Sequence, residues 1–148
     1  MGTGPGRGVG ELAGRPVLDT DVLIDYLRGS GAGAELLSRL RETLAYRVTA
    51  VSAFELALGR SFAADSAPVR AVLSVPCLSL GRRAGLRAGS LLADLRADGR
   101  EVERRDSMQA AICLEAGLPL VTRNVRHFDR IDSLHVVHPS EWLPGETP

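Results

Sequence analysis

The sequence predicts a three-layer α/β/α sandwich around a central, mainly parallel sheet of four to five strands. Short apolar runs alternate with helical repeats along the chain, which is the order found in folds that cover both faces of a parallel sheet. The 148 residues, 45% of them apolar, suffice for one core. No internal repeat is present, and nothing marks a second domain.

The expected elements follow from apolar spacing and from glycine and proline stops. Strands are predicted at 16–18, 46–51, 75–80, 120–122 and 134–137, and helices at 22–27, 36–44, 52–62, 84–95 and 108–116. Pro76 places the third strand near an edge of the sheet, because proline cannot donate a ladder hydrogen bond. The apolar stripe of the second helix is expected to end at Leu44, and that of the third to comprise Phe54, Ala57, Leu58, Ser61 and Phe62.

The ends of the chain lack such patterns. A single domain is expected over 15–143, with a flexible Gly-rich extension at 1–14 and a short tail at 144–148. No window approaches the roughly 18 apolar residues of a membrane helix, so we expect a cytoplasmic protein. Cys77 and Cys113 lie in apolar stretches and are expected to be reduced core residues. Trp142 is expected to pack the chain end against the sheet.

All 18 basic residues are arginine, and they balance 18 acidic residues. A neutral chain has no overall field that draws it to nucleic acid, so any site for a polyanion must be local. The absence of lysine excludes chemistry that needs an ammonium group, such as a Schiff base or the lysine of a P-loop kinase.

Polar side chains follow the predicted strands or open the predicted helices. Because the carboxyl ends of parallel strands meet at one crevice, we expect these side chains to converge. Crowded carboxylates take up protons unless a cation neutralises them. Oxygen ligands without histidine suit Mg²⁺ or Mn²⁺, and such a site is typical of metal-assisted attack of water on a phosphodiester. The residues are Asp19, Asp21, Glu55, Asp106 and Asn124.

Several of these residues also have a purely structural interpretation. Ser52 and Glu55 fit the S-x-x-E capping box of a helix start. Asp106, with Gln109 three residues later, fits an N-cap, and Asn124 fits a turn or cap. A residue at a helix start can also direct its side chain into a cleft, so both interpretations stay open.

Four segments together resemble the successive motifs of a known family. They are Pro16–Asp25, Ser52–Gly59, Arg105–Ala111 and Leu120–Phe128. In this order and at these separations they resemble PIN-domain ribonucleases, with the best match in the VapC toxin branch of bacterial and archaeal toxin–antitoxin systems. The resemblance spans about residues 15–143 and implies a PIN-like fold.

The resemblance also implies roles for individual residues. Asn124 stands where many relatives have an aspartate, and it is expected to take part in catalysis without adding charge. Asp21 and Asp129 are secondary candidates for the acidic site. The implied cofactor is Mg²⁺ or Mn²⁺, held by Asp19, Glu55 and Asp106.

The implied activity is that of an endoribonuclease that leaves a 3′-hydroxyl and a 5′-phosphate. A homodimer is implied, held inactive by a cognate VapB-like antitoxin whose carboxyl-terminal segment occupies the toxin groove. If that partner blocks the site by charge, it should place an arginine or similar cation among the carboxylates. Candidates for binding RNA phosphates are Arg123, Arg126, His127 and Arg130, and seven arginines between Arg82 and Arg105 form a second basic region.

Two other functions compete with this one. The domain could be a non-catalytic PIN-like binding module. Alternatively, Asp19-Thr20-Asp21 after an apolar strand also resembles the D-x-D motif of haloacid dehalogenase-like phosphohydrolases. The absence of lysine counts against the latter, because that family usually steadies its phosphoryl intermediate with a lysine.

Overall fold

The computed structural model describes residues 14–59 and 62–142. Residues 1–13 of the predicted extension, the predicted tail and Ser61 of the predicted third helix lie outside the described residues. The elements, in chain order, are β1 (Val17–Leu18), α2 (Thr20–Arg28), α3 (Ala32–Thr43), β2 (Val48–Thr49), α4 (Ala50–Leu58), α5 (Ala67–Val72), β3 (Cys77–Leu78), α6 (Arg82–Ala97), α7 (Arg104–Ala116), β4 (Leu120–Val121), α8 (Val125–Phe128), β5 (Val136–Val137) and the 3₁₀ helix η1 (Pro139–Glu141).

Every strand pair in the described part of the chain is parallel. β4 lies between β1 and β5, and β2 pairs with β3. A parallel bridge between Val17 and Arg47 joins the two groups, so the strands run in the order β3-β2-β1-β4-β5. The predicted parallel sheet is confirmed, and β3 is an edge strand as Pro76 indicated.

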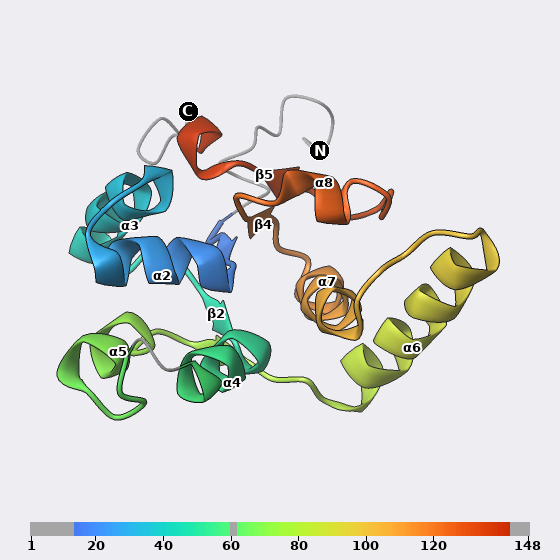
Figure 1. Ribbon diagram of the computed structural model, residues 1–148, viewed down its shortest axis with the longest axis horizontal. Helices are drawn as coiled ribbons and strands as arrows, with labels where there is room; N and C mark the ends of the chain where they lie inside the picture. The colour runs from blue at the N-terminus through green and yellow to red at the C-terminus, as the bar shows by residue number, and fades with distance from the viewer. Residues whose placement is uncertain (1–13, 60–61, 143–148) are drawn as a thin grey trace.

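Helices cover both faces of this sheet (Figure 1). Successive strand residues point to opposite faces, and each face has its own core. Leu18 and Val121 pack in one cluster with side chains of α2, α3, α4 and α5. Val17 and Leu120 pack in another with side chains of α6, α7 and α8. The two residues of each of these strands therefore contact helices on opposite faces of the sheet, which gives the three-layer arrangement.

The first turn of α4 differs from the prediction. The helix begins at Ala50, because Thr49 is its N-cap and the Thr49 hydroxyl accepts a hydrogen bond from the Ser52 amide (3.1 Å). Of the predicted apolar stripe, Phe54 (63% exposed), Ala57 and Leu58 (69% exposed) face outward. Phe62 lies beyond the end of α4 and packs, partly buried, against the core. The buried face of α4 instead carries Val51, Ser52 and Leu56.

Other differences are local. The chain around Pro68, for which no helix or strand is predicted, forms α5, because the Ser66 hydroxyl caps its start and proline is compatible with a first helical turn. Leu44 ends α3 in a left-handed conformation and is exposed, so it does not extend the apolar stripe. Cys77 is exposed at the sheet edge rather than in the core, whereas Cys113 is buried, and both are free thiols.

Trp142 packs as predicted, since it is buried in the cluster that contains Leu18 and Val121. No helix in the described ranges is long and apolar enough to cross a membrane.

Candidate active site

The predicted polar residues meet in one cleft of about 340 Å³ at the carboxyl ends of the strands. β1 leads directly into the first of them, and the loop after β4 supplies the last. The other three acids are Asp21 from α2, Glu55 from α4 and Asp106 from α7. The lining includes Asp19, Asp21, Glu55, Asp106 and Asn124.

Asp19 is fixed by hydrogen bonds to both of its carboxylate oxygens. The side chain caps α2, with Oδ1 accepting from the Thr20 amide (2.9 Å) and from Gln109 Nε2 (3.0 Å). Oδ2 accepts from the Thr122 hydroxyl (2.8 Å). Asp19 is only 2% exposed, and these donors supply the partners that a buried carboxylate requires.

Gln109 is a part of the site that the sequence did not reveal. It is completely buried in α7, and its Oε1 accepts from the Thr49 hydroxyl (2.6 Å) while its Nε2 also donates to the Ser52 hydroxyl (3.2 Å). The predicted N-cap at Asp106 is wrong, because α7 begins at Arg104 and Glu103 occupies the cap position. Gln109 therefore donates a hydrogen bond to Asp19 instead of capping its own helix. The sequence signal that could have identified it is a polar amide among the apolar residues of the predicted helix, three residues after Asp106.

Glu55 points into the cleft rather than back to its own helix start. Its Oε1 accepts from the Thr20 hydroxyl (2.5 Å), and the Ser52 hydroxyl lies within hydrogen-bond distance of the same Thr20 oxygen (2.9 Å). The predicted capping box is wrong, because the Ser52 amide is already bonded to Thr49. Glu55 is consequently available for the cleft, with its side chain 26% exposed.

Arg105 contacts all three acids that the resemblance identifies as metal ligands. Nη2 donates to Asp19 Oδ1 (2.5 Å) and Glu55 Oε1 (2.7 Å). Nε donates to Glu55 Oε2 (2.8 Å), and Nη1 to Asp106 Oδ1 (3.0 Å). Burial opposes the charge of Arg105, but the hydrogen bonds to Glu55 and the charge of Asp19 outweigh it and raise its pKa.

In the described part of the chain, no three Asp, Glu, His or Cys side chains lie as they stand in an arrangement that could hold a metal ion. The guanidinium of Arg105 instead lies among the carboxylates.

Asp21 and Asn124 form a second polar group in the same cleft. Asp21 Oδ2 accepts from the Arg123 amide (3.1 Å) and from Asn124 Nδ2 (3.3 Å). Its other oxygen, Oδ1, is buried without a hydrogen-bond partner. Burial, followed by the charge of Asp19, raises the pKa of Asp21 to about 6. The Arg123 side chain lies 3.4 Å from Asp25 Oδ2, so an ion pair already engages this RNA-phosphate candidate.

Asp106 faces His127 across the mouth of the cleft. His127 Nδ1 lies 3.8 Å from Asp106 Oδ2. Burial raises the pKa of Asp106, although the hydrogen bond from Arg105 partly offsets this effect. Asp129, the other secondary candidate, is exposed at the end of α8 and does not line the cleft.

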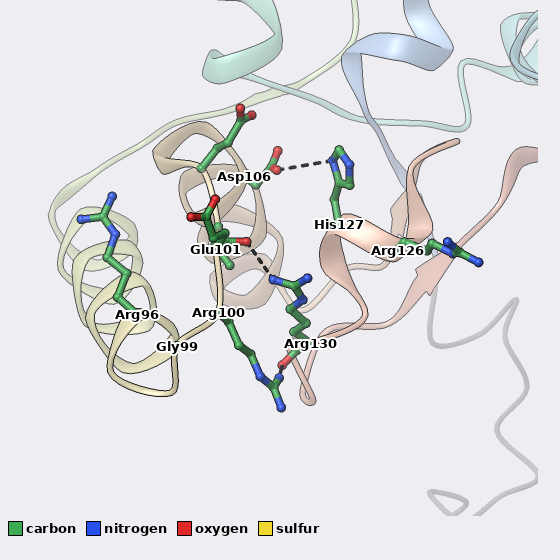
Figure 2. Close-up of a pocket in the computed structure, with 10 residues that line it drawn as sticks. Arg96, Gly99, Arg100, Glu101, Asp106, Arg126, His127 and Arg130 are labelled. Carbon is green, nitrogen blue, oxygen red and sulfur yellow. Dashed lines mark hydrogen bonds and ion pairs between the residues drawn. The ribbon is translucent and has the colours of Figure 1, made fainter.

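A larger basic groove of about 790 Å³ adjoins the acidic cleft (Figure 2). Glu103, Asp106 and His127 line both, so the groove leads directly to the carboxylates. Arg130 Nη1 donates to the Glu101 carbonyl (2.8 Å), which ties the two sides of the groove together. Its basic residues are Arg96, Arg100, Arg126, His127 and Arg130.

The seven arginines between Arg82 and Arg105 do not form one surface. Arg83 and Arg87 pair with Glu115 of α7, at 3.0 and 2.7 Å, and hold α6 against that helix. Arg96 and Arg100 line the groove, and Arg105 lies in the cleft. The arginines of the second predicted basic region therefore serve different places: some pair with α7, some line the groove and one lies in the cleft.

The fold also occurs in solved structures, among them a toxin–antitoxin complex from Klebsiella pneumoniae. VapBC-1 from nontypeable Haemophilus influenzae contains a chain with 24% identity and a TM-score of 0.66, and the match covers 84% of this chain and 98% of that one. DNA-bound VapBC from Salmonella typhimurium gives 22% identity, a TM-score of 0.66 and the same coverage. FitAcB from Neisseria gonorrhoeae gives 19% identity and a TM-score of 0.68, covering 85% of this chain and 99% of that one.

No curated protein matches the chain. The PIN domain family model matches residues 17–134, which include β1, β4 and every acid of the cleft. A haloacid dehalogenase-like phosphohydrolase is not supported by this match. The chain belongs to the PIN domain family.

Proposed function

We propose that this chain is a metal-dependent endoribonuclease toxin of the VapC type that acts in the cytoplasm. The observation that carries the proposal is the convergence of Asp19, Glu55 and Asp106 on one cationic group. Three acids from separate segments that share a cation have the charge and position expected of a metal site.

The donor set fits a hard divalent ion such as Mg²⁺ or Mn²⁺. The three proposed ligands, Asp19, Glu55 and Asp106, offer only carboxylate oxygens. Asp21 adds a buried oxygen that has no hydrogen-bond donor, as expected beside a cation. When bound, the ion would activate water and stabilise negative charge on the phosphate.

The chain's own side chains supply positioning. Gln109 and Thr122 fix the Asp19 carboxylate, and Asn124 has an amide that can donate to a phosphate oxygen. In the reaction, water adds to phosphorus and the bond from phosphorus to the 3′ oxygen breaks, which leaves a 3′-hydroxyl and a 5′-phosphate. Arg126 and His127 line the adjoining groove, where they would hold neighbouring RNA phosphates.

A VapB-like antitoxin and a second copy of the chain are the proposed partners. The solved structures with this fold are toxin–antitoxin complexes, which supports an antitoxin for this chain as well. Phe54 and Leu58 on α4 support a protein partner, because both are large, apolar and exposed on the helix that carries Glu55.

Cleavage of total cellular RNA by the purified chain tests this function. We expect discrete cuts with Mg²⁺ or Mn²⁺, and none with EDTA or after Asp19→Asn. Glu42→Gln, an exposed acid on α3, is the matched control and should cleave like the unmodified chain. Metal-independent cuts, or cuts that persist in Asp19→Asn, would contradict the proposal. Complete inactivity of the folded, metal-loaded, antitoxin-free chain would favour the non-catalytic binding module.

A further inference from the structure

Arg105 engages the oxygens that the proposed metal needs. The guanidinium binds both oxygens of Glu55 and one oxygen each of Asp19 and Asp106. Arg105 comes from the first turn of α7, directly before Asp106. Its side chain is 24% exposed, so it reaches from the mouth of the cleft into the acidic group.

The contacts leave little room for a second cation on the same oxygens. Asp19 Oδ1 already accepts from the Thr20 amide and from Gln109 in addition to Arg105. Glu55 uses both oxygens in a two-point contact with Arg105, which is the strongest geometry for an arginine–carboxylate pair. A divalent ion on these oxygens would also be repelled by the guanidinium charge.

We propose that Arg105 is a built-in competitor of the divalent metal, which pairs with Asp19, Glu55 and Asp106 in the metal-free chain and must leave them for the ion to bind. The inference rests on the proposed function, because it takes these acids as the metal ligands. It adds that the chain sets its own metal affinity through an internal cation. Linkage requires that whatever weakens the arginine contacts strengthens metal binding.

Mn²⁺ binding to the purified full chain without RNA tests this inference, measured by calorimetry or by the spin signal of free Mn²⁺. Arg105→Gln, which removes the charge, should bind Mn²⁺ on the order of tenfold more tightly than the unmodified chain. Arg104→Gln is the matched control, because Arg104 is an exposed neighbour in the same helical turn. It should bind Mn²⁺ like the unmodified chain.

A folded Arg105→Gln chain with unchanged or weaker Mn²⁺ affinity would overturn the inference. An equal gain in Arg104→Gln would also overturn it, since the effect would then be general electrostatics. If the unmodified chain binds Mn²⁺ and Asp19→Asn does not, the metal site of the proposed function stands in either case. If neither the unmodified chain nor Arg105→Gln binds Mn²⁺, both the metal site and the inference fail.

Loss of the arginine leaves the three acids without their cation, so thermal unfolding is the second measurement. Arg105→Gln should melt lower than the unmodified chain in EDTA, and Mn²⁺ should raise its melting temperature more than that of the unmodified chain. If the variant is unfolded in EDTA, Mn²⁺ should restore its fold. A variant that stays unfolded with Mn²⁺, or that gains no more from Mn²⁺ than the unmodified chain, contradicts the inference.

Discussion

Replacing Asp21 with asparagine should stabilise the metal-free chain at neutral and alkaline pH. Asp21 has one buried oxygen without a donor. An amide at this position removes the buried charge, and its oxygen can still accept the hydrogen bonds from the Arg123 amide and Asn124. Asp21→Asn therefore isolates the cost of ionising this carboxyl group in the fold.

The size of the effect follows from the pKa of Asp21, which burial raises from 3.8 to about 6. A tenfold change in an acid dissociation constant corresponds to about 1.4 kcal/mol, so full ionisation costs the fold at most about 3 kcal/mol. Between these two pKa values the folded chain binds more protons than the unfolded chain. Its stability therefore falls as pH rises through this window, and the penalty is fully present above pH 7.

Urea unfolding in EDTA at pH 4, 6 and 8 measures this difference. Asp21→Asn and the unmodified chain should be of nearly equal stability at pH 4, and the variant should gain about 1–3 kcal/mol by pH 8. Asp129→Asn is the control, because Asp129 is exposed outside the cleft, and it should show no such trend. A difference that does not change with pH, or a variant less stable than the unmodified chain at pH 8, would refute the reasoning.

Three further outcomes follow from the contacts. Gln109→Leu removes a buried amide that makes three hydrogen bonds in the site, to Thr49, Asp19 and Ser52, and it should lower the free energy of unfolding by about 2–4 kcal/mol. A urea midpoint close to that of the unmodified chain would show that the amide is dispensable. A thiol reagent should label exposed Cys77 in the native chain and Cys113 only after unfolding, as mass spectrometry would report. Arg126→Ala and Arg130→Ala should each weaken RNA binding in EDTA and reduce its salt dependence by about one phosphate contact, whereas an unchanged salt slope would exclude the residue from the RNA path.

The sequence was sufficient for the order of the predicted strands and longer helices and for the convergence of the acids, but it did not predict α5 or α8. The convergence was predictable because carboxyl ends of parallel strands share one edge, whatever the sequence distance between Asp19 and Asn124. The start of α4 could not be predicted, because Thr49 and Ser52 are both residue types that cap helices well. The tertiary hydrogen bond between Thr49 and Gln109 selects Thr49 as the N-cap. Periodicity identified an apolar face on α4 that contains Phe54, but periodicity does not tell which face its own core covers.

The role of Arg105 illustrates the other limit of sequence reasoning. The residue stands in a quoted motif, yet a long side chain one residue before an acid can equally reach solvent. Its direction depends on Glu55 and Asp19, which the fold brings to α7 from other elements. An arginine among the carboxylates was expected to come from an antitoxin, whereas the chain supplies one itself.

The cleft carries more negative charge than the single positive charge of Arg105 can balance. The carboxylates that line the cleft belong to Asp19, Asp21, Glu55, Glu103 and Asp106, and Arg105 pairs with three of these five. Asp21 lies outside the reach of these contacts. Burial, followed by the charge of Asp19, raises its pKa to about 6, so this carboxyl group keeps its proton to a higher pH than a free aspartate. A divalent ion carries more charge than the guanidinium. If it replaces Arg105, binding should therefore release a proton from Asp21 near pH 6, and calorimetry in buffers of different ionisation enthalpy would detect that release.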